Sequence, residues 1–478
     1  GGAVLFASDT DGNNSGKISS GNGLTIDTRT GLSGAKSTTG TGGGAITLAG
    51  GDQAGTGYAA GLSAADATGI RVDNGLWLYS GGGDIAMRGK SWAGAVGSGG
   101  AAWGIGFWNG ATSLVADSGV GKIYLEGISR SSGTSSYKMG LSTYYAVDLK
   151  SAYAGADAIK LVGSNTTSGA GWNHGIDLGT GNEASSAATY QKIVASGVGG
   201  GISIIGTGNE FAVLIRNGSQ ILANGGPINI KAGGLGLTAT TSTFYFRNGS
   251  TQWWGSAAGS AVTSTNSNLL LEFDNYSGSG YPNIATNGTV TWQSTGNAFG
   301  GSIDSSWFAW NTNGQTMSGL TIGKTTNSAY ITLNNDLTAN GPISIFGNDI
   351  WANYNLTSTA LGAGILLKTI GASPVQTNGF IALASGKNIT TNGGNVVLWS
   401  NSANITSGTA NNEIVLAGSN TISTSGGKIV LAGGLDDGGV ASGASSLIAG
   451  LVAGDGRPDG YAVNYGGTNI QYGIMLGT

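Results

Sequence analysis

The segment GGAITLAGG, residues 43–51, carries the pattern that decides the fold. Ile46 and Leu48 are separated by one polar residue and flanked by glycines. Alternating apolar residues between glycine turns predict a short β-strand with two inward-facing side chains. The same pattern recurs along the chain, with its first isoleucine at Ile46, Ile85, Ile123, Ile159, Ile202 and Ile228, and then at Ile343, Ile381, Ile414 and Ile429.

A second strand signal lies between these segments. Gly104-Ile105, Gly140-Leu141 and Gly175-Ile176 follow one another at intervals of 36 and 35 residues. Short strands of this kind cannot bury an apolar face alone, so they predict a β-solenoid whose coils stack and share one core. With two strands per period of about 38 residues, we expect coils of ~19–25 residues and roughly 20–25 coils.

The chain also repeats on a longer scale. Four segments recur in the same order: GGAVLFAS (1–8) as GGNVVLWS (393–400), GGAITLAGG (43–51) as GGKIVLAGG (426–434), GYA (57–59) as GYA (460–462), and GLWL (75–78) as GIML (473–476). We interpret the chain as one period of about 390 residues plus the start of a second. Both termini are then expected to be continuation points, covered by further covalent repeats or by neighbouring subunits.

Composition favours an extended repeat protein over an enzyme. Glycine accounts for 92 of 478 residues and charged residues for 9%, whereas ~7% glycine and ~25% charge are ordinary. The hydrophobic content of 39% suffices for a long core. The absence of cysteine excludes disulfides and thiol chemistry, and a net charge of −4 without a basic patch argues against nucleic acid as a partner. No apolar run reaches a membrane-spanning length.

The middle of the chain departs from the pattern. We divide the sequence into solenoid repeats at 1–234, a less regular aromatic-rich section of the same solenoid at 235–335, and repeats at 336–478, within which 393–478 begins the second copy. The tryptophans singled out as possible ligand-contacting residues are Trp253, Trp254, Trp292, Trp307 and Trp310. They either fill larger coils or form an exposed platform for sugars or a neighbouring filament.

Alternation along each strand predicts which residues face the core. We expect Thr47, Ser203, Asn229 and Ser344 to point outward. The residues expected to point inward and stack between coils are Ile46, Leu48, Ile85, Ile123, Leu125, Ile202, Ile204, Ile228, Ile230, Ile343, Ile345, Ile429 and Leu431.

Residues that could carry chemistry are sparse. The single histidine, His174, is expected at a corner or on the surface. Solenoid enzymes that cleave polysaccharides need clustered acids, and the candidates here are Glu272 with Asp274, Asp304, and Asp436 with Asp437. Acids this scattered are typical of solvated turns, so we predict no catalytic residues and no cofactor.

Asp9, Asp11 and Asn13 resemble the start of a calcium-binding EF-hand loop, with oxygen ligands at alternate positions. The twelfth position is Ser20 in place of glutamate, so the closing bidentate ligand is missing. The second copy has Asn401 where the first has Asp9 and loses both carboxylates. The three residues are therefore a weak metal candidate beside a simpler interpretation, an Asx-rich turn.

The strings GGPINIKAGG (225–234) and GLTIGKTTNSAYITL (319–333), together with GGNVVLWS and GGKIVLAGG, resemble the glycine-rich repeats of filamentous-haemagglutinin-type, two-partner-secreted exoproteins. These are very large surface proteins of Gram-negative bacteria. The resemblance implies an all-β fold, a right-handed parallel β-helix, displayed outside the cell and serving adhesion, biofilm or filament formation.

These observations together predict a non-catalytic segment of an extracellular surface fibre or adhesin. Its expected partners are further copies of the repeat and surface polysaccharide. One alternative is a purely structural filament or sheath subunit, which an extended multi-copy assembly would favour. A second alternative is a carbohydrate-binding or carbohydrate-cleaving β-helix, which acids converging in a groove on adjacent coils would favour.

Overall fold

The protein is an all-β chain of short parallel strands. The computed structural model describes residues 2–21, 23–30, 42–51, 55–108, 112–116, 120–135, 137–167, 172–179, 191–215, 219–233, 243–246, 253–255, 266–278, 282–370, 379–403, 411–439, 452–464 and 473–477. Within these ranges there is no α-helix, and a single 3-10 turn spans Ser305–Trp307. The chain forms two compact units, Gly1–Gly288 and Thr289–Thr478.

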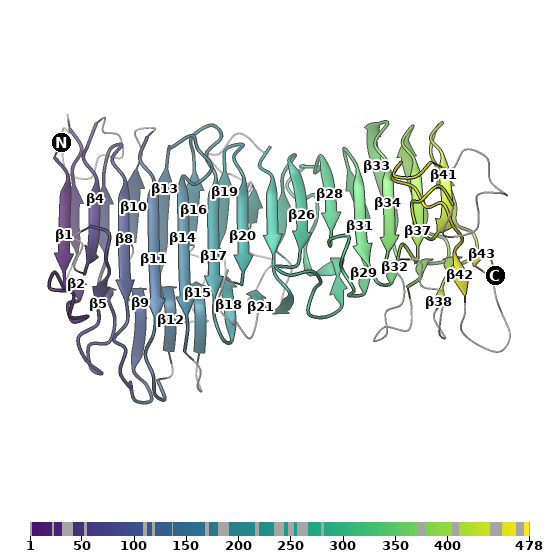
Figure 1. The fold of residues 1–478 in the computed structure, drawn as a ribbon. Helices are drawn as coiled ribbons and strands as arrows, with labels where there is room; N and C mark the ends of the chain where they lie inside the picture. Colours follow the sequence, from purple (N-terminus) through teal and green to yellow (C-terminus); the bar gives the residue numbers. More distant parts are fainter. Residues whose placement is uncertain are drawn as a thin grey trace. The chain divides into compact units, whose positions relative to one another are not determined.

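The first unit is a three-sided parallel β-solenoid, in which each coil adds one strand to each of three sheets (Figure 1). The main sheet contains β1 (Val4–Ser8), β4 (Ile46–Gly50), β8 (Ile85–Lys90), β11 (Ile123–Ser129), β14 (Ile159–Asn165), β17 (Ile202–Thr207), β20 (Ile228–Ala232) and β23 (Leu269–Glu272), with the two-residue β5 (Ala59–Ala60) beside β8. The second sheet contains β2 (Ile18–Ser20), β6 (Ile70–Val72), β9 (Ala101–Phe107), β12 (Tyr137–Thr143), β15 (Trp172–Leu178), β18 (Phe211–Ile215), β21 (Thr243–Phe246) and β24 (Asn275–Gly278). The third contains β3 (Leu24–Asp27), β7 (Leu76–Tyr79), β10 (Thr112–Ala116), β13 (Val147–Ser151), β16 (Lys192–Ala195), β19 (Gln220–Ala223), β22 (Trp253–Gly255) and β25 (Asn283–Ala285).

The second unit has the same three-sided plan. Its main sheet contains β26 (Thr289–Gln293), β28 (Gly319–Ile322), β31 (Ile343–Gly347), β34 (Ile365–Thr369), β37 (Val396–Ser400) and β41 (Ile429–Gly433). The second sheet contains β27 (Ile303–Asp304), β29 (Ile331–Leu333), β32 (Ile350–Ala352), β35 (Ile381–Leu383), β39 (Ile414–Leu416) and β43 (Ile474–Leu476). The third contains β30 (Leu337–Ala339), β33 (Leu356–Leu361), β36 (Asn388–Asn392) and β40 (Thr421–Ser423), and the short strands β38 (Asn411–Asn412) and β42 (Val463–Asn464) pair antiparallel.

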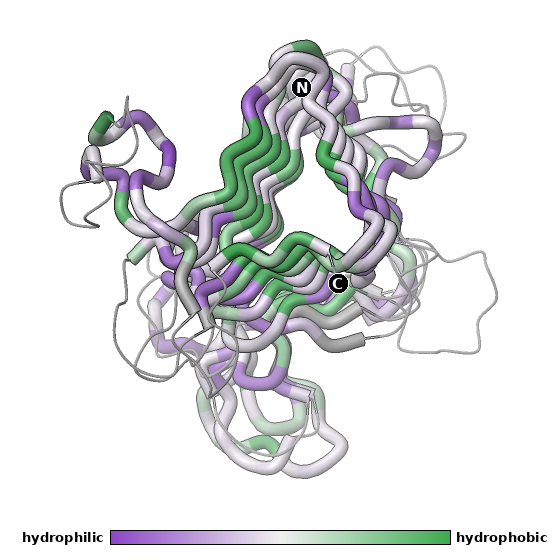
Figure 2. Tube along the Cα trace, turned by 90° about the vertical axis from the view of Figure 1, so that its right-hand side faces the viewer, coloured by the Kyte–Doolittle hydropathy of each residue, from purple (hydrophilic) through white to green (hydrophobic). Residues whose placement is uncertain are grey.

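The isoleucine ladder predicted from the sequence is confirmed in the first unit. Ile46 pairs with Ile85, and the row continues through Ile123, Ile159, Ile202 and Ile228 in unbroken register. These side chains are fully buried. Figure 2, viewed from the C-terminal side, shows rows of hydrophobic residues along the walls of the stacked coils. The second strand signal is confirmed as well, because Ile105, Leu141 and Ile176 pair in the second sheet.

Three expectations about the repeat need correction. The coils of the first unit are longer than the expected ~19–25 residues. Their successive main-sheet strands are 26 to 43 residues apart, because each coil carries a third strand that we did not predict. Coils of the predicted length occur between Leu320, Ile343 and Ile365, so the described coils are far fewer than 20. Ile381 and Ile414 belong to the second sheet of their unit, and Ile429 is 47% exposed because β41 is the last strand of its main sheet.

Glycines allow two sheets of the first unit to touch backbone to backbone. A Cβ atom on Gly127 would lie 2.0 Å from the carbonyl oxygen of Gly140, and one on Gly163 would lie 2.2 Å from that of Gly175. A Cβ on Gly140 itself would lie 2.3 Å from the amide nitrogen of Ser164. Main sheet and second sheet therefore meet here along a glycine seam, with no room for side chains.

The long sequence repeat has matching local geometry. In the first copy Val4 pairs with Ile46, and in the second their counterparts Val396 and Ile429 pair in the same register. The residue after the first strand adopts a left-handed conformation in both copies, with φ of 54° at Asp9 and 52° at Asn401. A turn that requires positive φ, tolerated by aspartate and asparagine, follows the strand in both places.

A glycine contact recurs in the same way. The amide of Gly50 donates to the carbonyl of Gly57 at 3.3 Å, and the amide of Gly433 donates to the carbonyl of Gly460 at 3.4 Å. The loop that each pair closes is short in the first copy and much longer in the second.

Candidate functional site

The residues proposed as a weak calcium site build a turn. Asp9 Oδ1 accepts a hydrogen bond from the amide of Ser15 at 3.1 Å, and Asp11 Oδ2 accepts one from Asn13 Nδ2 at 2.7 Å. Asp9 is buried whereas Asp11 and Asn13 are exposed. Because the left-handed position is filled by Asn401 in the second copy, the shared feature is the backbone turn and not a carboxylate pair.

Three of the tryptophans proposed as a platform have described side chains, and they differ in burial. Trp292 is fully buried and packs against Phe299, Trp307 and Phe308 at ring-centroid distances of 5.8, 5.6 and 5.1 Å. It belongs to the core of the second unit, so a ligand-contacting role is wrong for this residue. Trp307 and Trp310 are half-buried, and Trp310 Nε1 donates to the carbonyl of Ser305 at 2.7 Å.

Trp253 and Trp254 lie on β22, and their side chains are outside the described residues. A more exposed tryptophan lies where the sequence analysis did not look. Trp351 on β32 is 44% exposed and meets Phe380 edge to face at 4.6 Å. The alternation of residues along a strand shows which side chains point outward from the sheet. It does not show whether another part of the chain covers them, so this exposure could not be predicted from the sequence.

His174 is buried, not at a corner or on the surface as expected. Its Nδ1 is 3.3 Å from Asp177 Oδ2, and its Nε2 is 3.5 Å from Glu210 Oε2. Burial acts to lower the pKa of His174, but hydrogen bonds to Asp177 and then Glu210 outweigh it and hold the pKa above its usual value. An imidazole held between two carboxylates in this way has a structural role, and its 1% exposure leaves no access for a substrate.

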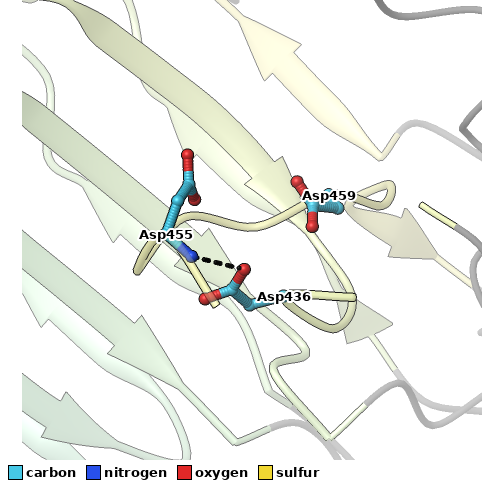
Figure 3. A group of neighbouring side chains, drawn as sticks. All are labelled: Asp436, Asp455 and Asp459. Atoms are coloured by element: carbon cyan, nitrogen blue, oxygen red, sulfur yellow. Dashed lines mark hydrogen bonds between the residues drawn. The ribbon is translucent and has the colours of Figure 1, made fainter. Parts of the chain in front are cut away.

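Three carboxylates converge in the second unit (Figure 3). Ligand oxygens of Asp436, Asp455 and Asp459 lie within 4.8 Å of one another. Asp436 comes from the turn after β41, whereas Asp455 and Asp459 come from the far end of the long loop that Gly433 and Gly460 close. Only Asp436 and its neighbour Asp437 were candidates from the sequence, because the other two acids lie about 20 residues further along the chain and the loop brings them back.

Most of these oxygens already have backbone partners. Asp436 accepts from the amides of Gly454 at 2.6 Å, Asp455 at 3.1 Å and Gly456 at 2.8 Å, and Asp459 accepts from the amide of Gly438 at 2.6 Å. Three carboxylates would supply part of the six to eight oxygens that Ca²⁺ takes. The first copy has no counterpart of this loop, so the cluster organises an insertion and not the repeat itself.

Glu272 and Asp304, two other acids considered for catalysis, lie in different units. Glu272 lies 3.6 Å from Lys231 in the first unit. Asp304, in the second unit, caps the 3-10 turn by accepting from the amide of Ser306 at 2.8 Å. Neither belongs to a group of three or more acids or histidines whose ligand atoms lie within 4.8 Å of one another among the described residues.

Asp349, just before β32, is a buried carboxyl group with a shifted pKa. It is 3% exposed, and its Oδ1 accepts from the amide of Phe380 at 3.2 Å. Burial raises the pKa of Asp349 to about 7, because the charged form loses its hydration and gains only this hydrogen bond. The folded protein therefore binds a proton here that the unfolded chain has released above pH ~4.

Replacing this group should change how stability depends on pH. Because the folded pKa is raised, the wild type loses stability as the pH rises from about 4 to about 7, and it stays lower above that range. Asp349→Asn keeps an acceptor oxygen and has no charge, so we expect it to be more stable than the wild type at pH 8, by at most about 4 kcal/mol. At pH 4 the two should be similar. Urea unfolding between pH 4 and 8 measures this, and parallel pH curves would contradict the assignment.

Apolar residues are exposed at the outer edge of each unit. In the first unit Leu5 and Phe6 on β1 are 51% and 44% exposed, and a cavity of about 90 Å³ opens between Phe6, Leu24 and the core. In the second unit Ile429, Ile474 and Leu476, on β41 and β43, are 47%, 37% and 66% exposed. Phe6, Ile429 and Ile474 align with Leu48, Val396 and Ile414, which are buried, whereas Leu5 aligns with the outward-facing Thr47. These edges therefore expose a cross-section of the core.

No helix among the described residues is long and apolar enough to cross a membrane. Comparisons with protein-family models, curated proteins and solved structures found no match.

Proposed function

We propose that this chain is a non-catalytic structural segment of a very large extracellular surface fibre or adhesin. The observation that carries the proposal is the pair of open solenoid edges, each with exposed apolar residues and strand backbone that has no neighbour among the described residues. Natural solenoids end in polar caps, since an open edge invites pairing with another strand. An uncapped segment is suited to lie within a longer stack of coils.

The two copies of the long repeat supply a second argument. In the first copy, Tyr58 donates to Glu126 Oε1 at 2.6 Å, and Tyr124 donates to Glu126 Oε2 at 2.7 Å. Glu126 also pairs with Arg88 at 3.0 Å, so strands β8 and β11 provide the partners that hold the loop of Tyr58. Tyr461 occupies the equivalent position in the second copy and is 41% exposed. Coils equivalent to β8 and β11, stacked on β41, would cover it.

A non-catalytic role is supported by the placement of the ionisable groups. His174 is enclosed between two carboxylates, and the acid cluster of the second unit is engaged by backbone amides. Extracellular display at a bacterial cell surface is proposed from the repeat style, the absence of cysteine and the low charge. Adhesion and biofilm formation are the roles that such a surface fibre would serve.

The open edges predict self-association. We expect the purified chain to form end-to-end oligomers whose mass rises with concentration in analytical ultracentrifugation and which appear as linear particles in electron microscopy. Phe6→Lys or Leu476→Lys should reduce the association strongly, because each places a charge in an apolar edge contact.

Matched controls are available within each unit. Val198→Lys and Leu361→Lys change exposed apolar residues, 80% and 85% exposed, that lie away from the edges, and they should associate like the wild type. The proposal would be contradicted if the chain stayed a monodisperse monomer at all concentrations, or if the edge and control variants lost self-association equally. Filaments that bind no surface would favour the alternative role of a purely structural filament or sheath.

A further inference from the structure

Two adjoining cavities lie on the outer face of the first unit, over strands β6 and β9. One, of about 180 Å³, is lined by Lys17, residues 64–68, Arg71 and residues 100–101. The other, of about 160 Å³, is lined by Thr68, Arg71, Gly99, Ala101, Trp103 and Trp108. The two share Thr68, Arg71 and Ala101, and together they come near the lower end of the ~300–1,000 Å³ of small-molecule sites.

The register of the second sheet creates this space. Arg71 on β6 pairs with Gly106 on β9, whereas the next two strands have Ser142 and Asp177 at the position of Gly106. The indole ring of Trp103 lies over Gly106, where a Cβ atom would be 1.9 Å from Cε3 of the ring. The missing side chain at Gly106 therefore leaves room for the indole ring of Trp103, which lines the second cavity together with Arg71.

Hydrogen-bond donors line both cavities, and the carboxylate of Asp66 also lines the first. Arg71 uses its Nε to donate to Asp73 at 2.9 Å, and its two terminal nitrogens have no hydrogen bond among the described residues. Trp103 is 2% exposed. Its Nε1 can only donate a hydrogen bond, and this atom is buried without a hydrogen-bond partner among the described residues. Lys17 adds a cation whose position is held by Asp66 at 2.5 Å.

Aromatic rings form the remaining wall. Trp108 lies 4.8 Å from Trp103 and stacks on Tyr144 at 5.2 Å with an interplanar angle of 16°. The guanidinium carbon of Arg71 is 5.8 Å from the ring of Trp108. An apolar aromatic wall beside unsatisfied donors matches a ligand with a flat apolar face and acceptor-only oxygens.

We propose that this cavity pair binds an acidic sugar residue of a polysaccharide, one carrying a carboxylate or a sulfate group. The terminal nitrogens of Arg71 donate to the oxyanion, and the pyranose ring packs beside Trp108. This inference adds a ligand class to the proposed fibre and does not depend on end-to-end assembly.

Titration of the full chain with short oligosaccharides tests the site. The probes are a tri-uronate, a sulfated disaccharide and neutral maltotriose, followed by calorimetry and by the NMR signal of the Trp103 indole N–H. We expect at least one acidic probe to bind, to shift that signal and to bind more weakly as salt rises, because the contact is partly ionic. The two acidic probes distinguish a carboxylate ligand from a sulfate ligand.

Variants test which residues bind the acidic probes. Arg71→Gln should weaken binding at least tenfold, Arg71→Lys should restore only part of it, and Trp103→Phe should weaken it several-fold while keeping an aromatic ring. Arg457→Gln, which removes a surface arginine of the second unit paired with Asp455 at 3.9 Å, is the matched control and should bind like the wild type. Equal binding of maltotriose, no binding of either acidic probe, or binding unaffected by Arg71→Gln would overturn the proposal.

Discussion

Gly140→Ala is expected to destabilise the first unit by about 3 kcal/mol or more, which is at or above the usual cost of overpacking. A methyl group at this position would lie 2.3 Å from the amide nitrogen of Ser164, 2.6 Å from the carbonyl of Gly175 and 2.7 Å from that of Gly127. All three contacts are backbone atoms of paired strands, so no side chain can rotate away. Relief requires the main and second sheets to move apart and to disturb their hydrogen-bond ladders.

The measurement is urea unfolding monitored by tryptophan fluorescence, with Gly97→Ala as the control. Gly97 lies in a loop of the same unit, and its added methyl group would meet nothing within 4 Å. We expect Gly97→Ala to be neutral or slightly stabilising, since it reduces the freedom of the unfolded chain. If both alanines had the same effect, the glycine seam would not be a close contact in solution.

Ile204→Asp should have an effect of similar size for a different reason. Ile204 is fully buried and stacks between Leu161 and Ile230 in the isoleucine-rich core of the first unit. A carboxylate there would have no cation to pair with on the inward face of these strands, and burying an unpaired charge costs several kcal/mol. We expect the variant to be unfolded or to unfold at much lower urea concentration.

The adjacent residue is the control for this variant. Ile205 points outward from the same strand and lies beside Lys231 on β20, so Ile205→Asp places its charge near a cation and solvent. Its stability should stay within about 1 kcal/mol of the wild type. Comparable losses in Ile204→Asp and Ile205→Asp would show that the strand register is wrong.

Much of the fold could be predicted because strand alternation and glycine punctuation are local signals. The row from Ile46 to Ile228 was readable, and so were the paired segments at Ile105, Leu141 and Ile176. The third strand of each coil was missed, because segments such as VDLKS (147–151) and KIVA (192–195) lack the preceding glycine that marks the others. The alternation of apolar and polar residues is also the same in strands of all three sheets. The local sequence therefore cannot show that Ile343 lies in the main sheet and Ile381 in the second sheet.

The sites were less predictable, because they depend on which residues the stack places side by side. Arg71 and Trp103 are 32 residues apart and meet only through the pairing of β6 with β9. His174 gave a signal, since Asp177 follows it at a distance that suits a side-chain contact, but its burial depends on Glu210 and Phe211 of the next coil. Composition pointed to the aromatic residues and could not separate the core residue Trp292 from the exposed Trp351.

The two loops closed by the same glycine contact suggest how such a chain evolves. Six residues separate Gly50 from Gly57, and 26 separate Gly433 from Gly460, yet both pairs form the amide-to-carbonyl bond beside a strand in the same register. Insertions and deletions at this corner therefore leave the inherited strand order untouched. Duplicated copies can therefore diverge in loop length and surface chemistry at this corner. New loops can evolve there without a change in the strands that form the core.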